Sequence, residues 1–300
     1  MNSNHYTANN LKNICACLLA ASIFLSMGCA KKRSLEQIKA DAEKGVAEAQ
    51  FELGRAYFKG EGVPRDYSKA LDFYLLAARQ GNVKALTNIG GLYAQGIIVK
   101  KDEAEALKWF RQAAEKGDTV AMYDIAWMTA HGQGTAQDDK EALLWFRKAA
   151  EAGQPDAQAR LGDMYVKGGN GVEKNDAEAA TWLRKAAEQG NASAQNTFGV
   201  LLENGMGVGK DLHEANLWFQ KAAGQGEPRG QMNFGRMFES AGDYKTACMW
   251  LILSANQGEI AAQKELQLLM GTKKINPAQY EEARLLAAEY QAKQRQQKKF

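Results

Sequence analysis

The residues whose types invite a chemical interpretation are a glycine-rich segment and three histidines. The segment Gly205–Lys210 looks like a phosphate-binding loop, but such a loop carries Ser or Thr after its Lys, and here Asp211 follows. His5, His131 and His213 stand apart, with no Cys or His at the spacing of metal ligands. The sequence therefore predicts neither a nucleotide site nor a metal site.

One acidic or amide residue recurs at the same place in every repeat. Such a regular series is not the pattern of a catalytic carboxylate pair. An Asp or Asn stands four places before an alanine in each repeat of a helical pattern: Asp66, Asp102, Asp138, Asn175, Asp211 and Asp243. These residue types cap the free amides at a helix start. No Ser, Cys or Lys lies in a recognisable nucleophile setting. We therefore expect helix caps, no catalytic residues and no cofactor, in a protein that is not an enzyme.

Composition narrows the class of protein. The 300 residues hold 38 Lys and Arg against 35 Asp and Glu, so nothing suggests the concentrated basic face that a nucleic acid backbone requires. Hydrophobic residues make up 45%, which is enough for a sizeable core. With only four prolines, intrinsic propensity favours helix. We expect an all-α protein that does not bind nucleic acid.

The chain repeats itself about every 36 residues. Successive units start at Ala49, Ala85, Ala121, Ala157, Ala194 and Gly230. The fourth unit gains one residue near Gly168–Gly171 and the sixth loses five near Ala241–Asp243, at the same internal loop. Length changes confined to one turn are typical of a stacked repeat array.

Each unit encodes two helices. In the second unit Ala85, Ile89, Gly90 and Tyr93 line one face of a first helix, which ends at Gly96. A second helix follows, with alanines around an aromatic pair. Five tryptophans share one place in this pair: Trp109, Trp145, Trp182, Trp218 and Trp250. We expect this tryptophan, Trp145 for example, to be the buried core knob of its repeat.

This pattern resembles the Sel-one-like repeat, a relative of the tetratricopeptide repeat, over residues 49–258. The resemblance implies a right-handed α-solenoid of about six helix-turn-helix repeats that mediates protein-protein interaction. With its caps, the solenoid is expected to span residues 34–290, from a half-repeat at Ser34–Gly45 to helices at Ala262–Met270 and Pro277–Tyr290. Residues 291–300, basic and poor in apolar side chains, are predicted to be a disordered tail.

The N-terminus has a different character. Ile14–Gly28 is uncharged and mostly apolar, with the length of a signal-peptide core. Its end at Cys29 resembles a bacterial lipoprotein signal, which implies a signal peptide over residues 1–28, lipidation of Cys29 and a short linker over 29–33. Ala30 rather than Asp after the cysteine implies the outer membrane, with the protein facing the periplasm. The protein would then be a membrane-anchored lipoprotein of the cell envelope.

An alternative keeps the apolar segment as an uncleaved membrane anchor. Only Lys12 precedes it, whereas Lys31–Arg33 follow it, and this bias would leave the body of the protein in the cytoplasm. In the lipoprotein interpretation the mature chain keeps Cys29 and Cys248 alone, so it forms no intramolecular disulfide.

A binding face is predicted from first-helix positions that the repeat pattern leaves out of the core. By analogy with tetratricopeptide arrays these line a concave groove. The candidates are Arg55, Phe58, Tyr123, Trp127, His131, Asp163, Met232 and Arg236. Trp127 is the one tryptophan outside the repeated core position, and large aromatics are typical of interface hot spots. The competing interpretation is that Tyr123, Trp127 and His131 compensate for Thr129, which stands where the repeat usually has Tyr.

The functional hypothesis is a non-enzymatic scaffold or adaptor of the bacterial cell envelope that binds a protein or peptide in this groove. One alternative is a hydrolase of cell-wall or β-lactam-like substrates, as proposed for cysteine-rich relatives whose paired cysteines this chain lacks. Another is a purely structural spacer.

Overall fold

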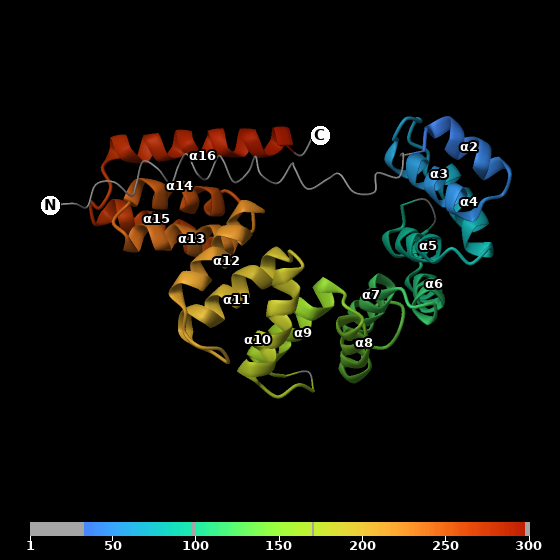
Figure 1. Cartoon of the computed structure of the whole chain (residues 1–300), viewed down its shortest axis with the longest axis horizontal. Coiled ribbons are helices and arrows are strands. Elements are labelled where there is room, and N and C mark those ends of the chain that lie inside the picture. The colour runs from blue at the N-terminus through green and yellow to red at the C-terminus, as the bar shows by residue number, and fades with distance from the viewer. Residues whose placement is uncertain (1–32, 98–99, 170, 298–300) are drawn as a thin grey trace. The chain divides into compact units, whose positions relative to one another are not determined.

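The computed structural model describes residues 33–97, 100–169 and 171–297, and over these ranges the chain forms helices and no strand (Figure 1). The helices are α2 Leu35–Glu43, α3 Ala47–Lys59, α4 Tyr67–Arg79, α5 Val83–Gln95, α6 Glu103–Glu115, α7 Thr119–Ala130, α8 Asp139–Glu151, α9 Pro155–Lys167, α10 Asp176–Glu188, α11 Ala192–Asn204, α12 Leu212–Gly224, α13 Pro228–Ser240, α14 Tyr244–Ala255, α15 Ile260–Gly271 and α16 Pro277–Gln297. The predicted all-α fold is confirmed. The predicted signal peptide 1–28 and Cys29 lie outside the described residues.

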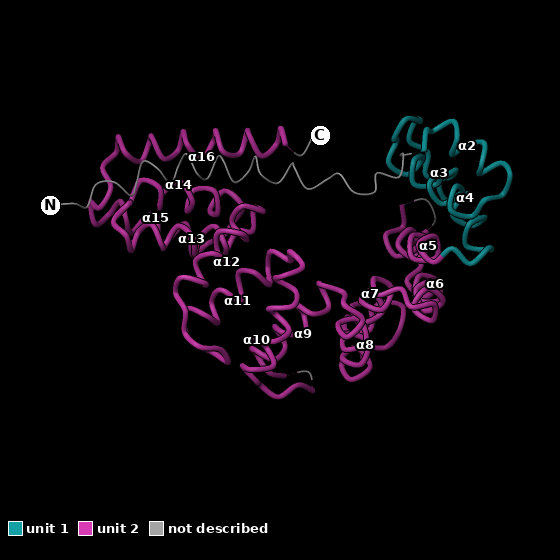
Figure 2. Tube along the Cα trace, viewed as in Figure 1, with its two compact units in different colours: residues 1–82 teal, residues 83–300 magenta. Residues whose placement is uncertain are grey.

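The helices fall into two compact units, residues 1–82 and 83–300 (Figure 2). In the first unit α2 packs on α3 and α3 packs on α4. In the second unit each helix from α5 to α14 packs on the helix that follows it in the chain. Packing between sequence neighbours is the arrangement of an α-solenoid, as the repeats predicted.

Close approach within each helix pair depends on a small residue in the first helix. A methyl group at Gly90 in α5 would lie 2.7 Å from the ring of Phe110 in α6, and one at Gly199 in α11 would lie 2.6 Å from the ring of Phe219 in α12. In the third repeat Ala126 is fully buried at the same place. A small residue at this position therefore lets the two helices of a repeat approach closely.

The buried knob of the second helix is the residue after the tryptophan, and the expectation for Trp145 is wrong. Phe146 is 2% exposed, whereas Trp145 is only half-buried. Two members of the tryptophan series are buried at 8% exposure, Trp218 and Trp250. Of two adjacent apolar residues on a helix, only one can face the glycine of the partner helix, because neighbours are separated by about 100°.

Trp145 instead lies at the edge of the core, where its indole finds polar partners on its own helix. Its Nε1 donates to Glu141 Oε1 at 3.3 Å, and Lys148 Nζ lies 4.5 Å from the ring centroid. An indole with one apolar face and one polar edge suits such a boundary. The position therefore combines packing with surface contacts.

The predicted helix caps are present in every repeat. The side chains of Asp66, Asp102, Asp138, Asn175, Asp211 and Asp243 each accept a hydrogen bond from a backbone amide in the first turn of the following helix. At the other end of a first helix, Gly205 takes φ 71°, a left-handed conformation that favours glycine. The acidic series is thus structural.

A buried glutamine joins consecutive repeats, a feature that the sequence pattern did not reveal. Gln158, 4% exposed, donates through Nε2 to the carbonyl of Ala150 at 3.0 Å and accepts from Gln189 Nε2 at 2.7 Å. The same two bonds recur at Gln50, Gln195 and Gln231. Each glutamine donates a second hydrogen bond to a carbonyl at the end of the preceding helix, which also accepts a backbone amide, that of Gly153 in the case of Ala150.

The N-terminal half-repeat is present as predicted. Ser34 caps α2 by accepting from the amide of Gln37 at 3.2 Å. Arg33 pairs with Glu52 of α3 at 2.9 Å. The apolar side of α2 is thereby held against the first full repeat.

The C-terminus differs from the prediction. Residues 291–297, expected to be disordered, continue α16 to Gln297, while residues 298–300 lie outside the described part. α16 packs along α14 (Figure 1), where Tyr290 meets Trp250 edge to face at 5.1 Å. This contact and the helix-favouring Gln, Ala and Lys residues extend the helix. None of the described helices is both long and apolar enough to cross a bilayer.

Candidate partner-binding face

The predicted site residues lie on four first helices in the two units. Arg55 and Phe58 belong to α3 in the first unit, where Arg55 is exposed and Phe58 packs on Tyr67 with ring centroids 5.3 Å apart. The other six belong to the second unit: Tyr123 and Trp127 on α7, His131 at the C-cap of α7, Asp163 on α9, Met232 and Arg236 on α13. The second unit holds the larger candidate face.

Trp127 and His131 form an exposed aromatic pair. The Trp127 side chain is 41% exposed, a large fraction for an indole. The imidazole of His131 stacks on it with centroids 4.2 Å apart and planes inclined by 25°, and His131 Nδ1 lies 2.7 Å from the Trp127 carbonyl oxygen. Stacking and hydrogen bonding hold the two rings in one orientation, so they form a rigid apolar platform.

Tyr123 behaves differently from Trp127, although the two are one helical turn apart. Its ring packs edge on to Phe146 of α8 at 5.7 Å, and burial, together with the nearby Asp156, raises its pKa. Tyr123 is part of the core cluster of the third and fourth repeats. Its role here is packing.

The surroundings of Thr129 show which aromatic side chains compensate for the Tyr that the repeat usually has at this position. Its side chain is fully buried and its hydroxyl has no hydrogen-bond partner among the described residues. Tyr123 packs into the core near this helix, whereas Trp127 remains outside the core cluster. Local compensation therefore accounts for Tyr123 and leaves the exposure of Trp127 unexplained.

Two carboxyl groups of this part of the chain, Asp124 on α7 and Asp163 on α9, are half-buried. Burial, with a smaller contribution from Asp118, raises the pKa of Asp124 to about 6. Burial also raises the pKa of Asp163 against the opposing influence of Lys167 and Arg160. Carboxyls with raised pKa values desolvate at lower cost when a partner covers them.

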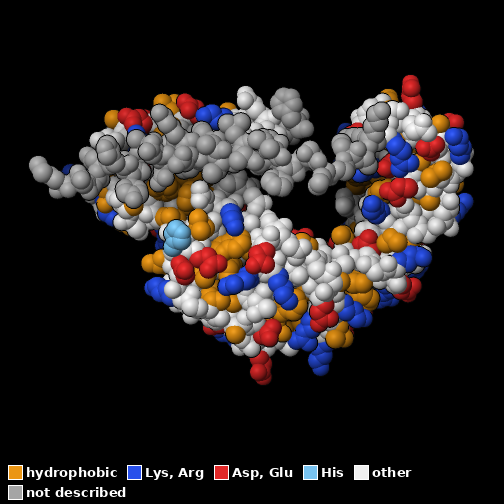
Figure 3. Space-filling model, in the orientation of Figure 1, with side chains coloured by type: hydrophobic (Ala, Val, Ile, Leu, Met, Phe, Trp, Pro, Cys, Tyr) orange, Lys and Arg blue, Asp and Glu red, His pale blue; other side chains and the backbone are white. Residues whose placement is uncertain are grey.

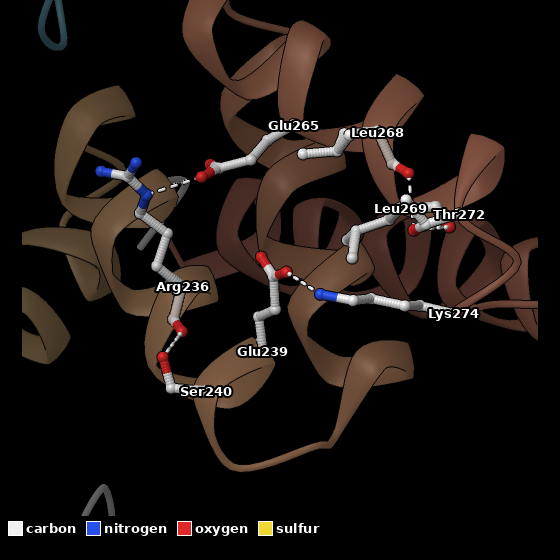
Figure 4. A network of polar contacts seen from close by, with 8 residues as sticks. All are labelled: Arg236, Glu239, Ser240, Glu265, Leu268, Leu269, Thr272 and Lys274. Carbon is white, nitrogen blue, oxygen red and sulfur yellow. Dashed lines mark hydrogen bonds and ion pairs between the residues drawn. The ribbon is translucent and has the colours of Figure 1, made fainter.

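Arg236 is engaged in the fold and is not a free binding residue. Figure 4 shows it reaching from α13 to α15, where its Nε lies 2.6 Å from Glu265 Oε1. Beside it Lys274 pairs with Glu239 at 3.1 Å. These ion pairs fasten α15 to the sixth repeat, and Met232 on the same helix is half-buried against the core. The site is thus centred on α7 and α9.

Charge over the second unit is mixed. Figure 3 shows Lys and Arg interspersed with Asp and Glu over α9 to α12, with apolar side chains between them. No group of three or more His, Cys, Asp or Glu residues with metal-binding geometry occurs in the described ranges. The imidazole of His131 stacks on Trp127 and lies within hydrogen-bond distance of its carbonyl oxygen. The face offers apolar and polar contact area and no evident reaction chemistry.

Comparison with known proteins agrees with this architecture. The family model of the Sel1 repeat matches six times: residues 47–82, 83–118, 119–154, 155–191, 192–227 and 232–259. A solved structure of a protective antigen of uropathogenic Escherichia coli, which displays an SLR fold, is 34% identical, with a TM-score of 0.71 over 86% of this chain and 56% of that one. The chain thus spans little more than half the length of that relative.

A Sel1 repeat protein from Oxalobacter formigenes is 30% identical, with a TM-score of 0.64 over 73% of this chain and 89% of that one. A search of curated proteins finds no match. The likeness extends over the repeats and their packing.

Proposed function

The chain belongs to the Sel1 repeat family, and we propose that it is a non-enzymatic scaffold that binds a protein or peptide partner through the first-helix face centred on Trp127. Sel1 repeats generally mediate protein-protein interaction. The observation that carries the proposal is the 41% exposure of Trp127 in a central repeat, on a platform already fixed by His131.

Energetics favour Trp127 as the anchor of such an interface. A tryptophan exposed in the free protein regains apolar contact when a partner covers it, and hot spots are enriched in this residue. Because His131 restrains the indole, little side-chain entropy is lost on binding. Arg160 and Lys167, which lie close enough to Asp163 to influence its pKa, would offer the partner polar contacts.

Replacing Trp127 with Ala should weaken partner capture by about 10- to 100-fold, the usual cost of truncating a hot spot. The melting temperature should stay nearly unchanged, because Trp127 lies outside the core cluster. The measurement is crosslinking and pull-down with the detergent-extracted protein, followed by affinity determination with the partner identified.

The matched control is Leu144→Ala, which removes an apolar side chain that is 59% exposed on the second helix α8. This variant should capture the partner as well as the original chain. Intact capture by a folded Trp127→Ala protein, or a large fall in its melting temperature, would count against the binding face.

The proposed location is the bacterial cell envelope, with the scaffold anchored through a lipidated Cys29 in the outer membrane and facing the periplasm. The support is the Ile14–Gly28 apolar segment that ends at this cysteine. The uropathogenic Escherichia coli relative is described as a protective antigen, which suits an exported protein. An uncleaved membrane anchor is the competing arrangement.

Cys29→Ala should abolish the acyl modification, leave the signal peptide uncleaved and raise the polypeptide mass accordingly. Mass spectrometry of the membrane fraction is the measurement. Stable attachment needs more than one acyl chain, so a lipoprotein should carry several on Cys29. If the original chain and the variant have the same unmodified N-terminus, the anchor is the uncleaved segment.

A further inference from the structure

A cavity of about 370 Å³ lies between the third and fourth repeats, open to solvent. Arg147 and Glu151 of α8 line one side, and Glu178 and Trp182 of α10 line the other. The loop 171–175 and the end of α9 complete its wall. The charged groups and the aromatic ring come from three helices and a loop.

The loop of the fourth repeat is the one that holds an extra residue, and it is placed differently from its counterparts. Gly169 and Val172 exchange two backbone hydrogen bonds of 2.9 and 3.0 Å, and Val172 is buried. In the third and fifth repeats Gly134 and Gly207 lie directly against the start of the preceding second helix. A methyl group at Gly171 would meet only Leu143, at 3.7 Å. Gly171 thus approaches α8 only at the Leu143 side chain, whereas Gly134 and Gly207 lie against the backbone of their neighbouring helices.

The matching place in the fifth repeat is filled by side chains. There Phe198 packs against Trp218 with centroids 5.8 Å apart, and Arg184 lies 5.0 Å over the Phe198 ring. In the fourth repeat the smaller Leu161 takes the place of Phe198, and Arg147 takes the place of Arg184. The missing aromatic ring accounts for part of the cavity volume.

The polar groups around the cavity also lack the contacts that their counterparts make. Trp145 and Trp218 each donate an indole N–H to the glutamate four residues earlier, at 3.3 and 3.1 Å. Among the residues that the structure describes, neither the Trp182 N–H nor Glu178 has such a bond, and Arg147 forms no ion pair. The Trp182 N–H and Glu178, whose counterparts in the third and fifth repeats bond to each other, are therefore available to a ligand here, together with Arg147.

We propose that this cavity binds a zwitterionic amino acid or dipeptide. The guanidinium of Arg147 and the Trp182 N–H are donors suited to a carboxylate, and Glu178 with Glu151 is suited to an ammonium group. Available groups of both signs favour a ligand that carries both charges over a simple anion or cation. Tyr165 and the Trp182 ring provide apolar contact for the body of the ligand. This site is separate from the Trp127 face.

Isothermal titration calorimetry of the full-length chain in mild detergent tests the proposal with the dipeptide Ala-Ala. We expect a dissociation constant of about 0.1–1 mM, a value typical of a small ligand with a few charged contacts. N-acetyl-Ala-Ala N-methylamide, which lacks both charges, should not bind. Glu178→Gln and Arg147→Gln should each weaken binding about tenfold.

The control variant is Glu214→Gln, at the position of the fifth repeat that corresponds to Glu178, and it should leave the affinity within about twofold because the Phe198 ring occupies the matching place there. Leu161→Phe restores the ring found at Phe198 and should abolish binding of Ala-Ala while the melting temperature is kept or raised. Absence of binding by the original chain at about 10 mM, equal losses in Glu178→Gln and Glu214→Gln, or full binding by a folded Leu161→Phe protein would overturn the proposal.

Discussion

Replacing Phe146 with Ala should lower the free energy of unfolding by about 3–5 kcal/mol, the usual cost of deleting a buried aromatic side chain. Phe146 is 2% exposed, and Tyr123 of α7 packs edge on to its ring. Loss of the ring would leave a void between these helices that the small residue Ala126 could not fill. Chemical denaturation monitored by circular dichroism measures the change.

The adjacent Trp145→Ala is the matched comparison for this experiment. Because Trp145 is half-buried and its polar contacts are on its own helix, its loss should cost about 1–2 kcal/mol. Hydrogen exchange would show the loss of protection in Phe146→Ala concentrated in α7 and α8, since each repeat contacts its neighbours. A larger loss of unfolding free energy in Trp145→Ala than in Phe146→Ala would mean that Trp145 is the buried core residue, as the sequence predicted.

Gly207→Ala should destabilise the protein by about 2–5 kcal/mol, through two effects. The residue has φ 67°, a left-handed conformation that costs an alanine about 1–2 kcal/mol. A methyl group there would also overlap the carbonyl group of Asp176 at the start of α10, in the preceding repeat. The loop cannot move away without separating the two repeats.

Gly190→Ala separates these two effects. Gly190 has φ 92°, and a methyl group on it would meet no atom within 4 Å. Only the cost of the left-handed conformation applies, so Gly190→Ala should lower the free energy of unfolding by about 1–2 kcal/mol. Thermal and chemical unfolding of both variants gives the difference, which measures the contact between repeats. Equal losses of unfolding free energy in the two variants would mean that the contact between Gly207 and the start of α10 does not contribute to stability.

Local signals explain why the helices and their caps could be predicted from the sequence. An N-cap such as Asp102 and a helix-ending glycine such as Gly205 act on backbone groups within one turn, so their residue types suffice. Periodicity of the apolar residues likewise fixes the buried face of a helix. It does not separate Trp145 from Phe146, because both lie within the same apolar sector.

Contacts between residues far apart in the sequence explain the features that could not be predicted. Gln158 is a residue type usually found at the surface, and its burial follows from two partners supplied by α8 and α10. Arg236, assigned to the binding face by its register, is held by Glu265 of a helix beyond the repeats. The cavity arises from Leu161 and from the position of one loop, which only a comparison among folded repeats makes visible.

The buried glutamines give the array an uneven mechanical stiffness. At the junctions of α8 with α9, α10 with α11 and α12 with α13, directional hydrogen bonds oppose sliding of one repeat along the next. At the junction of α6 with α7 the corresponding residue is Met122, whose flexible apolar side chain supplies no directional hydrogen bond against shear. Under a load along the second unit, the α6–α7 junction would therefore tolerate more sliding than the three junctions that carry a glutamine.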